Sequence, residues 1–176
     1  MSGGYTLPGE TKSFSDDMRS GKCYGAEFTI PYDNAFGIGV KFSDFSSYAE
    51  QKDGMTTTTG DDDIMFLGTY GSITNFISSK RHSFFVNLGI GAIRYDSNRQ
   101  NVRKEGYALG GYAGIQYDYR LSNCLAIGAE ISTIIGKLDS IRESVGGGKS
   151  ASKPLHGNDR IPLNRFDANI GLRFYL

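Results

Sequence analysis

The chain has 176 residues, a formal net charge of zero, 24 glycines, 11 tyrosines and 11 phenylalanines. This length suits one domain spanning residues 1–176. Zero net charge provides no global field to attract nucleic acid. No apolar run approaches the roughly 20 residues of a transmembrane helix, so a helical membrane protein is excluded. A membrane β-barrel is not excluded, because its apolar residues are spread over alternate positions.

The amino terminus carries neither the basic nor the apolar region of a signal peptide. If the protein is exported, we expect its signal peptide to have been removed. The short segment 3–7 is the only candidate for a first strand. A closed up-and-down barrel with both termini at one end needs an even number of strands, and the rest of the chain supplies seven.

Alternation with a period of two predicts these seven strands. Apolar residues alternate with small or polar ones over 24–30 and 36–43, and the turn formers of 31–34 between them predict a hairpin. The segment 64–73 is a denser apolar strand whose facing the pattern does not decide. The alternation returns at 84–92, 107–119, 125–132 and 166–176.

The connections between these strands differ in length in a regular way. Three short ones (31–35, 74–82 and 120–123) alternate along the chain with four long polar ones (8–21, 46–62, 96–104 and 136–163). All short turns therefore fall at one end of the predicted barrel, the short-turn end, and all long loops at the other, the long-loop end. Outer-membrane barrels show this asymmetry.

Alternation alone also fits a soluble barrel with its apolar face inward. Three observations favour an outward apolar face. The apolar faces carry no charged residue, the polar faces hold mostly small residues rather than the Lys and Glu of a solvated surface, and aromatic residues gather at both ends of the apolar faces. The aromatic residues are Phe36, Tyr70, Phe84, Tyr117, Tyr119 and Phe174 at the short-turn end, and Tyr24, Phe42, Tyr107 and Phe166 toward the long-loop end.

Residues 24–176 resemble the small outer-membrane β-barrels of the OmpA/OmpX type, the "outer membrane protein β-barrel domain" group. The resemblance is carried by Gly-Tyr-Ala-Gly-Ile-Gln-Tyr at 111–117, Ile-Gly-Ala-Glu-Ile at 127–131 and the ending at 166–176. That ending resembles the assembly signal of such barrels, although it closes on Leu176 where the family usually has Phe. The resemblance implies an all-β, antiparallel up-and-down transmembrane barrel of about eight strands in the outer membrane of a Gram-negative bacterium. The group is functionally mixed, so no activity follows.

Four charged residues are predicted to face the inside of the barrel: Glu27, Lys41, Glu130 and Arg173. Lys41 is placed about two residues diagonal to Glu27, and the other two lie on the last two strands. Buried charges must pair, so we expect a structural charge network. A gated pore or proton path is the alternative, although barrels this small usually have no continuous channel.

Basic residues flank the long loops, among them Arg94, Arg160 and Arg165. Those that could meet lipopolysaccharide phosphates are Arg99, Arg103, Lys104, Lys149 and Lys153. Acidic residues are interspersed, which favours an ordinary solvated rim.

No cofactor or metal site is expected. The stretch 143–150 lacks the first glycine of a phosphate-binding loop and is predicted to be a flexible external loop. Asp61, Asp62 and Asp63 are consecutive, whereas calcium loops space their ligands by two, so a solvated loop end is expected. Cys23 and Cys124 start strands at opposite ends of the barrel, too far apart for a disulfide.

We therefore expect a monomeric structural or surface-interaction barrel that contacts the lipid bilayer and, through its loops, lipopolysaccharide or a host surface. No catalysis is expected. One alternative is a soluble calycin-like barrel with an apolar ligand. A second is a small lipid-modifying barrel enzyme, which would use a histidine with a serine and an acid. His82 lies in a short turn, and His156 lies near Ser152 and Asp159 in the longest loop.

Overall fold

The computed structural model describes residues 2–8, 21–32, 35–53, 56–74, 81–99, 102–145, 151–155 and 160–174. These ranges hold strands, turns and bends, which confirms the all-β prediction. Among them, no helix is long and apolar enough to cross a membrane. The strands are β1 (Ser2–Pro8), β2 (Gly21–Pro31), β3 (Phe36–Asp53), β4 (Thr56–Thr74), β5 (His82–Arg99), β6 (Val102–Arg120), β7 (Leu125–Leu138), β8 (Ser140–Val145), β9 (Ala151–Pro154), β10 (Ile161–Pro162) and β11 (Arg165–Phe174).

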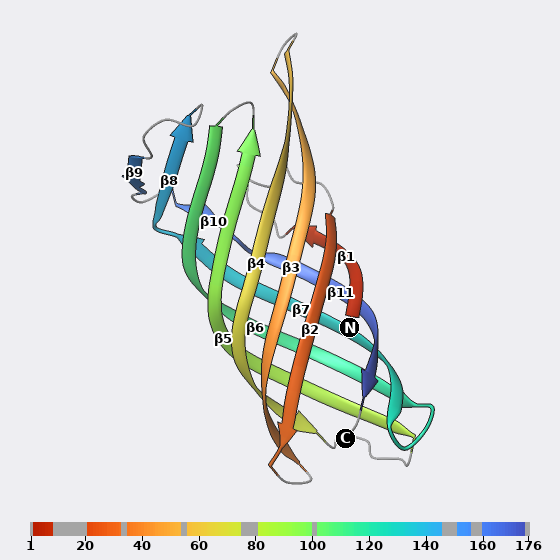
Figure 1. Ribbon diagram of the computed structural model, residues 1–176. Helices are drawn as coiled ribbons and strands as arrows, with labels where there is room; N and C mark the ends of the chain where they lie inside the picture. Colours follow the sequence, from red (N-terminus) through yellow and green to blue (C-terminus); the bar gives the residue numbers. More distant parts are fainter. Residues whose placement is uncertain are drawn as a thin grey trace.

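Each strand from β1 to β7 pairs antiparallel with the next one along the chain. β11 pairs with both β7 and β1, so the pairings lead from β1 through β7 and β11 back to β1. In Figure 1, β2, β3 and β4 run steeply across the front and β7 crosses behind them. The predicted up-and-down order is confirmed, and the predicted segment 3–7 lies within β1.

β1 covers its neighbours over only part of their length. It pairs with Gly21–Gly25 of β2 and with Arg165–Gly171 of β11. Below this level, in the described part of the chain, residues 26–31 of β2 and 172–174 of β11 have no β1 partner. We call this level, at the short-turn end, the notch.

Three predicted long loops are largely strands. β3 and β4 continue as a ribbon to Asp53 and Thr56, and β5 and β6 extend to Arg99 and Val102. The region 136–163 holds the end of β7 and all of β8, β9 and β10, so Glu143 of the predicted loop 143–150 belongs to β8. The polarity of these segments marks exposure to solvent, but backbone pairing between strands needs no apolar side chain.

The registers show that β7 and β8 form one long strand with a bulge. β7 pairs Gly136 with Gly110 of β6, whereas β8 pairs Arg142 with Glu105, a shift of one residue. Such an extra residue is the mark of a β-bulge and reverses the facing beyond it. Leu138 and Ile141, on either side of the bulge, are therefore both buried.

The strands have an apolar outer face and a mixed inner face. Leu88, Ile90 and Leu109 are 60%, 65% and 77% exposed, which confirms the outward direction predicted for the apolar faces. Tyr70, predicted to lie with the outward aromatic residues, is only 3% exposed and faces inward. The alternation of 64–73 resolves this, because Ile64 and Phe66 share its inner face while Leu67 faces outward.

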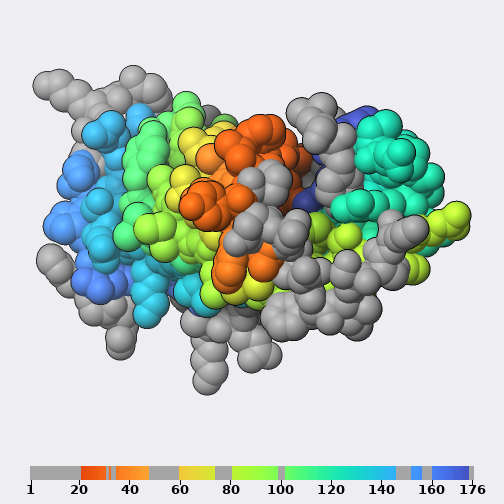
Figure 2. Space-filling view, turned by 90° about the horizontal axis from the view of Figure 1, so that it is seen from below, coloured from red at the N-terminus to blue at the C-terminus, as the bar shows by residue number. Residues whose placement is uncertain are grey.

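The apolar core lies on the inner face toward the long-loop end. Its members come from strands and from the region that was predicted to be the longest loop. Figure 2 shows the opposite, short-turn end, with side chains of β2 and β3 in orange and of the β6–β7 region in teal. The largest buried apolar residues of the core are Phe45, Ile64, Phe66, Ile93, Ile134, Leu138 and Leu163.

Candidate functional site

Lys41 is the centre of a buried charge network. Its Nζ donates to both carboxylate oxygens of Glu130, at 2.7 and 2.8 Å, and lies 3.6 Å from Oε2 of Glu27. Lys41 on β3 stands directly opposite Glu27 on β2. The predicted diagonal placement is therefore wrong by two residues, because the turn between the strands sets a different register. Glu130 is on β7, so its ion pair with Lys41 crosses the inside of the sheet.

Arg173 extends the network toward the short-turn end. Its guanidinium makes an ion pair with Glu27, and its Nε lies 3.3 Å from Oδ2 of Asp118. All four predicted charged residues are thus brought together, and Asp118 on β6 joins them. Asp118 was not singled out from the sequence, although it falls on the polar face of the alternating segment 107–119. Its place on that polar face is the sequence signal that could have identified Asp118 as an inner residue.

The ion pair between Arg173 and Glu27 spans the notch. Ser2 of β1 pairs with Gly171 on one side and Gly25 on the other. Arg173 and Glu27 lie two residues further along their strands, at a level where no described residue of β1 intervenes. This ion pair therefore ties β11 to β2 where backbone pairing is lacking.

Two tyrosines support the network. Tyr112 donates a hydrogen bond of 2.7 Å to Oε1 of Glu130, and the Nζ of Lys41 lies 4.8 Å from the Tyr112 ring centroid. Tyr70 packs edge-on against Tyr112 and shares a hydrogen bond with Thr29. A Cβ on Gly39 would overlap the Tyr70 ring. Glycine at this position lets the ring cross β3 to reach β2.

Arg165 forms a second buried cluster. It was predicted to lie on the rim of the long loops, but it is 2% exposed and faces inward from the start of β11. Its Nε donates to Asp167 at 3.1 Å, its Nη1 donates to the carbonyl of Ile64 at 2.8 Å, and its Nη2 donates to Ser43. Arg165 lies between the loop predicted at 136–163 and the strand predicted at 166–176, so it was grouped with the rim residues. In the structure it is the first residue of β11.

The acidic run is divided between two faces of β4. Asp62 is fully buried and accepts a 3.1 Å hydrogen bond from Tyr95, whereas Asp61 and Asp63 are exposed. The prediction of a solvated loop end is wrong for Asp62, because consecutive strand residues point to opposite faces. No group of side chains that could hold a metal ion occurs among the described residues.

The described basic residues of the rim do not all lie on one face. Arg103 lies 2.6 Å from Asp96 and 2.9 Å from Glu105, and the hydrogen bond to Asp96 raises the pKa of Arg103. Lys104 follows on the other face of β6, and Lys153 is exposed in β9. Arg99 ends β5, and Lys149 lies outside the described residues. Among the described side chains, those of Arg103 and Lys104 point to opposite faces of β6 and therefore do not join in one phosphate site.

The remaining candidates lie apart. His82 shares a 2.7 Å hydrogen bond with the hydroxyl of Tyr117 through its Nδ1, in an aromatic group at the short-turn end. His156, with Asp159 beside it in sequence, lies outside the described residues. Cys23 is buried and Cys124 is exposed, and they form no disulfide with each other, as predicted.

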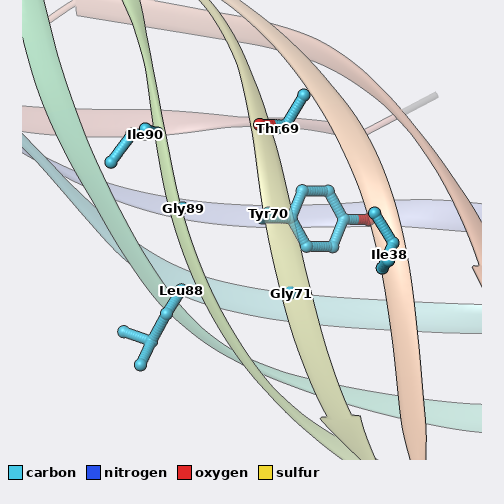
Figure 3. A pocket seen from close by; sticks show the side chains of 7 residues that line it. All are labelled: Ile38, Thr69, Tyr70, Gly71, Leu88, Gly89 and Ile90. Atoms are coloured by element: carbon cyan, nitrogen blue, oxygen red, sulfur yellow. The ribbon is translucent and has the colours of Figure 1, made fainter.

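A shallow apolar groove runs along the outer face of β4. Its volume is about 490 Å³, and Gly71, where an added Cβ would meet nothing within 4 Å, forms part of its floor. Ile38 and Leu88 stand in register on either side of Gly71. Figure 3 shows these side chains with Thr69 and Ile90, and the Tyr70 ring lying across toward β3.

Comparisons with known proteins add no assignment. No protein-family model matches the chain, and the search of curated proteins finds no match.

Proposed function

We propose that this chain is a transmembrane β-barrel of about eight strands in the outer membrane of a Gram-negative bacterium, of the OmpA/OmpX type. Its role is structural and surface-interacting: it anchors long external ribbons that contact lipopolysaccharide or a host surface, or that help to maintain the envelope. The barrel acts as a monomer in the lipid bilayer, and the proposal includes no catalytic step.

The observation that carries this proposal is the exposed apolar outer face. Burying one large aliphatic or aromatic side chain contributes about 1.5–3 kcal/mol, and a face of such residues left in water forgoes that contribution. A bilayer supplies the missing apolar surroundings. The exposed members of the face include Tyr24, Phe28, Ile38, Leu67, Leu88, Ile90, Tyr107, Leu109, Ile115, Ile131, Ile135, Phe166, Ile170 and Phe174.

The strand pairings support closure into a barrel. β7 pairs with β6 on one side and β11 on the other, and β1 joins β11 to β2. In a membrane every backbone polar group needs an internal partner, which a closed ring of strands provides. The level of the notch is the only part of this circuit, within the described strands, where β1 supplies no partner.

The inner face favours a structural role rather than a pore. Lys41, Glu130, Arg165 and Asp167 are each at most 5% exposed and lie in ion pairs. Such pairing fills the centre of a narrow barrel. A calycin-like ligand barrel would need the apolar face inside, whereas these apolar side chains are the exposed ones.

The long-loop end supports a surface role. The ribbon of β3 and β4 runs to Asp53 and Thr56, well beyond Phe42 and Leu67, whose apolar side chains are exposed on the outer face. β8 and β9 add a second extension beside β6. Most of the side chains of this second extension are polar, among them the exposed Lys153, while Ile141 faces the core. Paired strands hold such an extension in place more firmly than a loop of the same length.

Reconstitution into phospholipid vesicles tests the proposal. The refolded protein should float with the vesicles through a density gradient and resist extraction by urea, while added protease should trim only the ribbons of the long-loop end or the short turns, according to orientation. Protein that remains at the bottom of the gradient, or that urea removes, would refute membrane insertion.

A further inference from the structure

We propose that the groove on the outer face of β4 holds one acyl chain of a phospholipid from the leaflet at the short-turn end. The inference rests on the proposed membrane barrel and deepens it, because it assigns a defined lipid site to one part of the outer face. The ligand class is a glycerophospholipid with a long saturated chain, which the groove recognises through the chain rather than through the headgroup.

The groove is longer than the hollow over Gly71 alone. A second hollow of about 410 Å³ adjoins the first, and the two share Gly71 and the residues on either side of it. Together they run along the outer side of β4 from Thr69 to Ile73 and on to Tyr32, in the turn between β2 and β3. The groove therefore follows the strands instead of crossing them.

The strand register sets the floor and the walls of the groove. Ile38 on β3 and Leu88 on β5 stand directly opposite Gly71, and both are exposed (Figure 3). Their backbones lie two strand spacings apart, which is about 9–10 Å. An added Cβ on Gly71 would meet nothing within 4 Å. Because carbon atoms in contact lie about 4 Å apart, the gap over this glycine has the width of one methylene chain.

The length of the groove matches the depth of one leaflet. The apolar part of the outer face on β4 extends from Met65 to Ile73, and Thr69 lies halfway between them. The strand rises about 13 Å from Thr69 to Ile73, whereas the hydrocarbon of one leaflet is about 15 Å deep. The groove thus occupies the half of this face toward the short-turn end. A chain that enters from that surface of the bilayer fills the groove as far as the midplane.

Tyr32 marks the end of the groove at the bilayer surface. It is 85% exposed, and its backbone N–H donates to the carbonyl of Phe36 at 2.8 Å, which fixes the turn. Phe36 lies beside it in the lining of the groove. Tyrosine is favoured at membrane interfaces, because its ring packs among the chains while its hydroxyl group meets the headgroup region. A lipid whose chain lies in the groove therefore has its glycerol ester groups next to Tyr32.

A second copy of the chain is the other occupant that an apolar groove allows. A stable protein interface buries about 800 Å² on each partner. Contact between Lys41 on β3 and Glu130 on β7 means that the sheet curves around its inner face, so the outer face is convex and two copies would touch along a narrow line. A flexible acyl chain follows the groove over its whole length and gives its lining the dispersion contacts that an empty groove would lose. The geometry therefore favours the lipid chain.

Native mass spectrometry of the refolded full chain counts the lipid that it retains. The protein is held in a mild nonionic detergent with an equimolar amount of dipalmitoyl phosphatidylethanolamine, and the fraction of chains that carry one lipid is measured. Gly71→Leu fills the floor of the groove. Gly111→Leu on β6 is the matched control, because Gly111 is also exposed and an added Cβ there also meets nothing within 4 Å. Gly111 lines neither hollow of the groove.

We expect the wild-type chain to retain one lipid and Gly111→Leu to match it, whereas Gly71→Leu should bind about tenfold more weakly, because the new side chain overfills the groove. Both variants must keep the circular dichroism spectrum of the wild type. Equal retention by the two variants, no retention by the wild type, or equal competition by dihexanoyl phosphatidylethanolamine would overturn the acyl-chain site. Wild-type dimers that Gly71→Leu alone abolishes would make a second copy the occupant and would also overturn it.

Photolabelling of the wild-type chain needs no variant. A phosphatidylethanolamine with a diazirine at the end of one palmitoyl chain is irradiated in the same detergent, and peptide mass spectrometry locates the label. Label should concentrate near Thr69 and Ile90, where the chain ends, over the similarly exposed Ile170 of β11. Even labelling would overturn the site. Both measurements are made in detergent, so they test the groove even if vesicle flotation refutes the membrane proposal, and protein that floats but labels evenly loses only the groove site.

Discussion

Lys41 holds together carboxylates from two distant strands. We predict that Lys41→Met destabilises the protein by about 3–5 kcal/mol, because it leaves the buried carboxylate of Glu130 without its cation, whereas Glu27 keeps Arg173. Urea unfolding in detergent micelles measures this change. Lys153→Met is the matched control, since an exposed lysine should matter by less than about 0.5 kcal/mol. Similar midpoints for the two variants would show that the buried ion pair contributes nothing.

The double variant Lys41→Met with Glu130→Leu separates pairing from packing. Replacing both members of a buried ion pair by apolar residues is often neutral. We expect the double variant to recover most of the stability lost in Lys41→Met. A double variant that is less stable than the single one would instead assign the loss to side-chain packing.

Two glycines that lie on opposite faces of the sheet allow a second prediction about single residues. Gly39→Ala should destabilise the protein by about 1–3 kcal/mol, because the new methyl group overlaps the Tyr70 ring. Gly71→Ala, on the next strand, meets nothing within 4 Å and should be neutral or slightly stabilising. The same unfolding measurement compares them. Equal effects would contradict the inward packing of Tyr70 under Gly39.

Single residues were predictable where alternation fixed their face. Glu27, Lys41, Glu130 and Arg173 were assigned to the inside because their strands alternate cleanly. Arg165 was not, because its polar surroundings in sequence suggested a loop. The ion-pair partners of each charge could not be predicted from the sequence, because Lys41 meets Glu130 through the curvature of the whole sheet rather than through pairing of neighbouring strands.

At the scale of the element, the outer face of β5 gives the sharpest contrast. We predict that Leu88→Arg destabilises the protein folded in phospholipid vesicles by about 2–4 kcal/mol, the cost of placing an arginine against lipid at the bilayer midplane. Asn98→Arg, on the same face of the same strand beyond the apolar residues, should cost about 0–1 kcal/mol. Refolding equilibria in vesicles of fixed composition measure both.

The contrast between these variants depends on lipid. A soluble barrel would expose both positions to water and tolerate both arginines alike. Equal refolding free energies for Leu88→Arg and Asn98→Arg would therefore contradict contact of this face with a bilayer.

The elements themselves were predictable in existence and order but not in length. Apolar alternation predicted β2 to β7 and β11. The need for an even number of strands in a closed barrel predicted β1. The upper parts of β3, β4, β5 and β6 were taken for loops, because their residues are polar on both faces. Their stability comes from backbone pairing, which leaves no hydrophobic period to read. The bulge between β7 and β8 likewise depends on register, which the sequence does not display.

At the scale of the molecule, the two faces are reversed relative to a soluble domain. Apolar side chains are exposed outside, while ion pairs and hydrogen-bonded polar groups occupy much of the inside. The outward direction of the apolar faces was predicted from the sequence, and the exposed fractions of Leu88 and Lys41 bear it out. Membrane insertion and biological role do not follow from composition, since each depends on surroundings that the chain alone does not contain.

The most direct test of the central claim is folding with and without detergent, followed by circular dichroism and by gel mobility of boiled and unboiled samples. A lipid-facing barrel should become β-rich only in detergent and should migrate differently when unboiled, because a closed barrel resists the denaturing detergent. A monodisperse, β-rich protein in plain buffer, with one mobility whether boiled or not, would contradict the account and require the apolar face to be covered by something other than lipid.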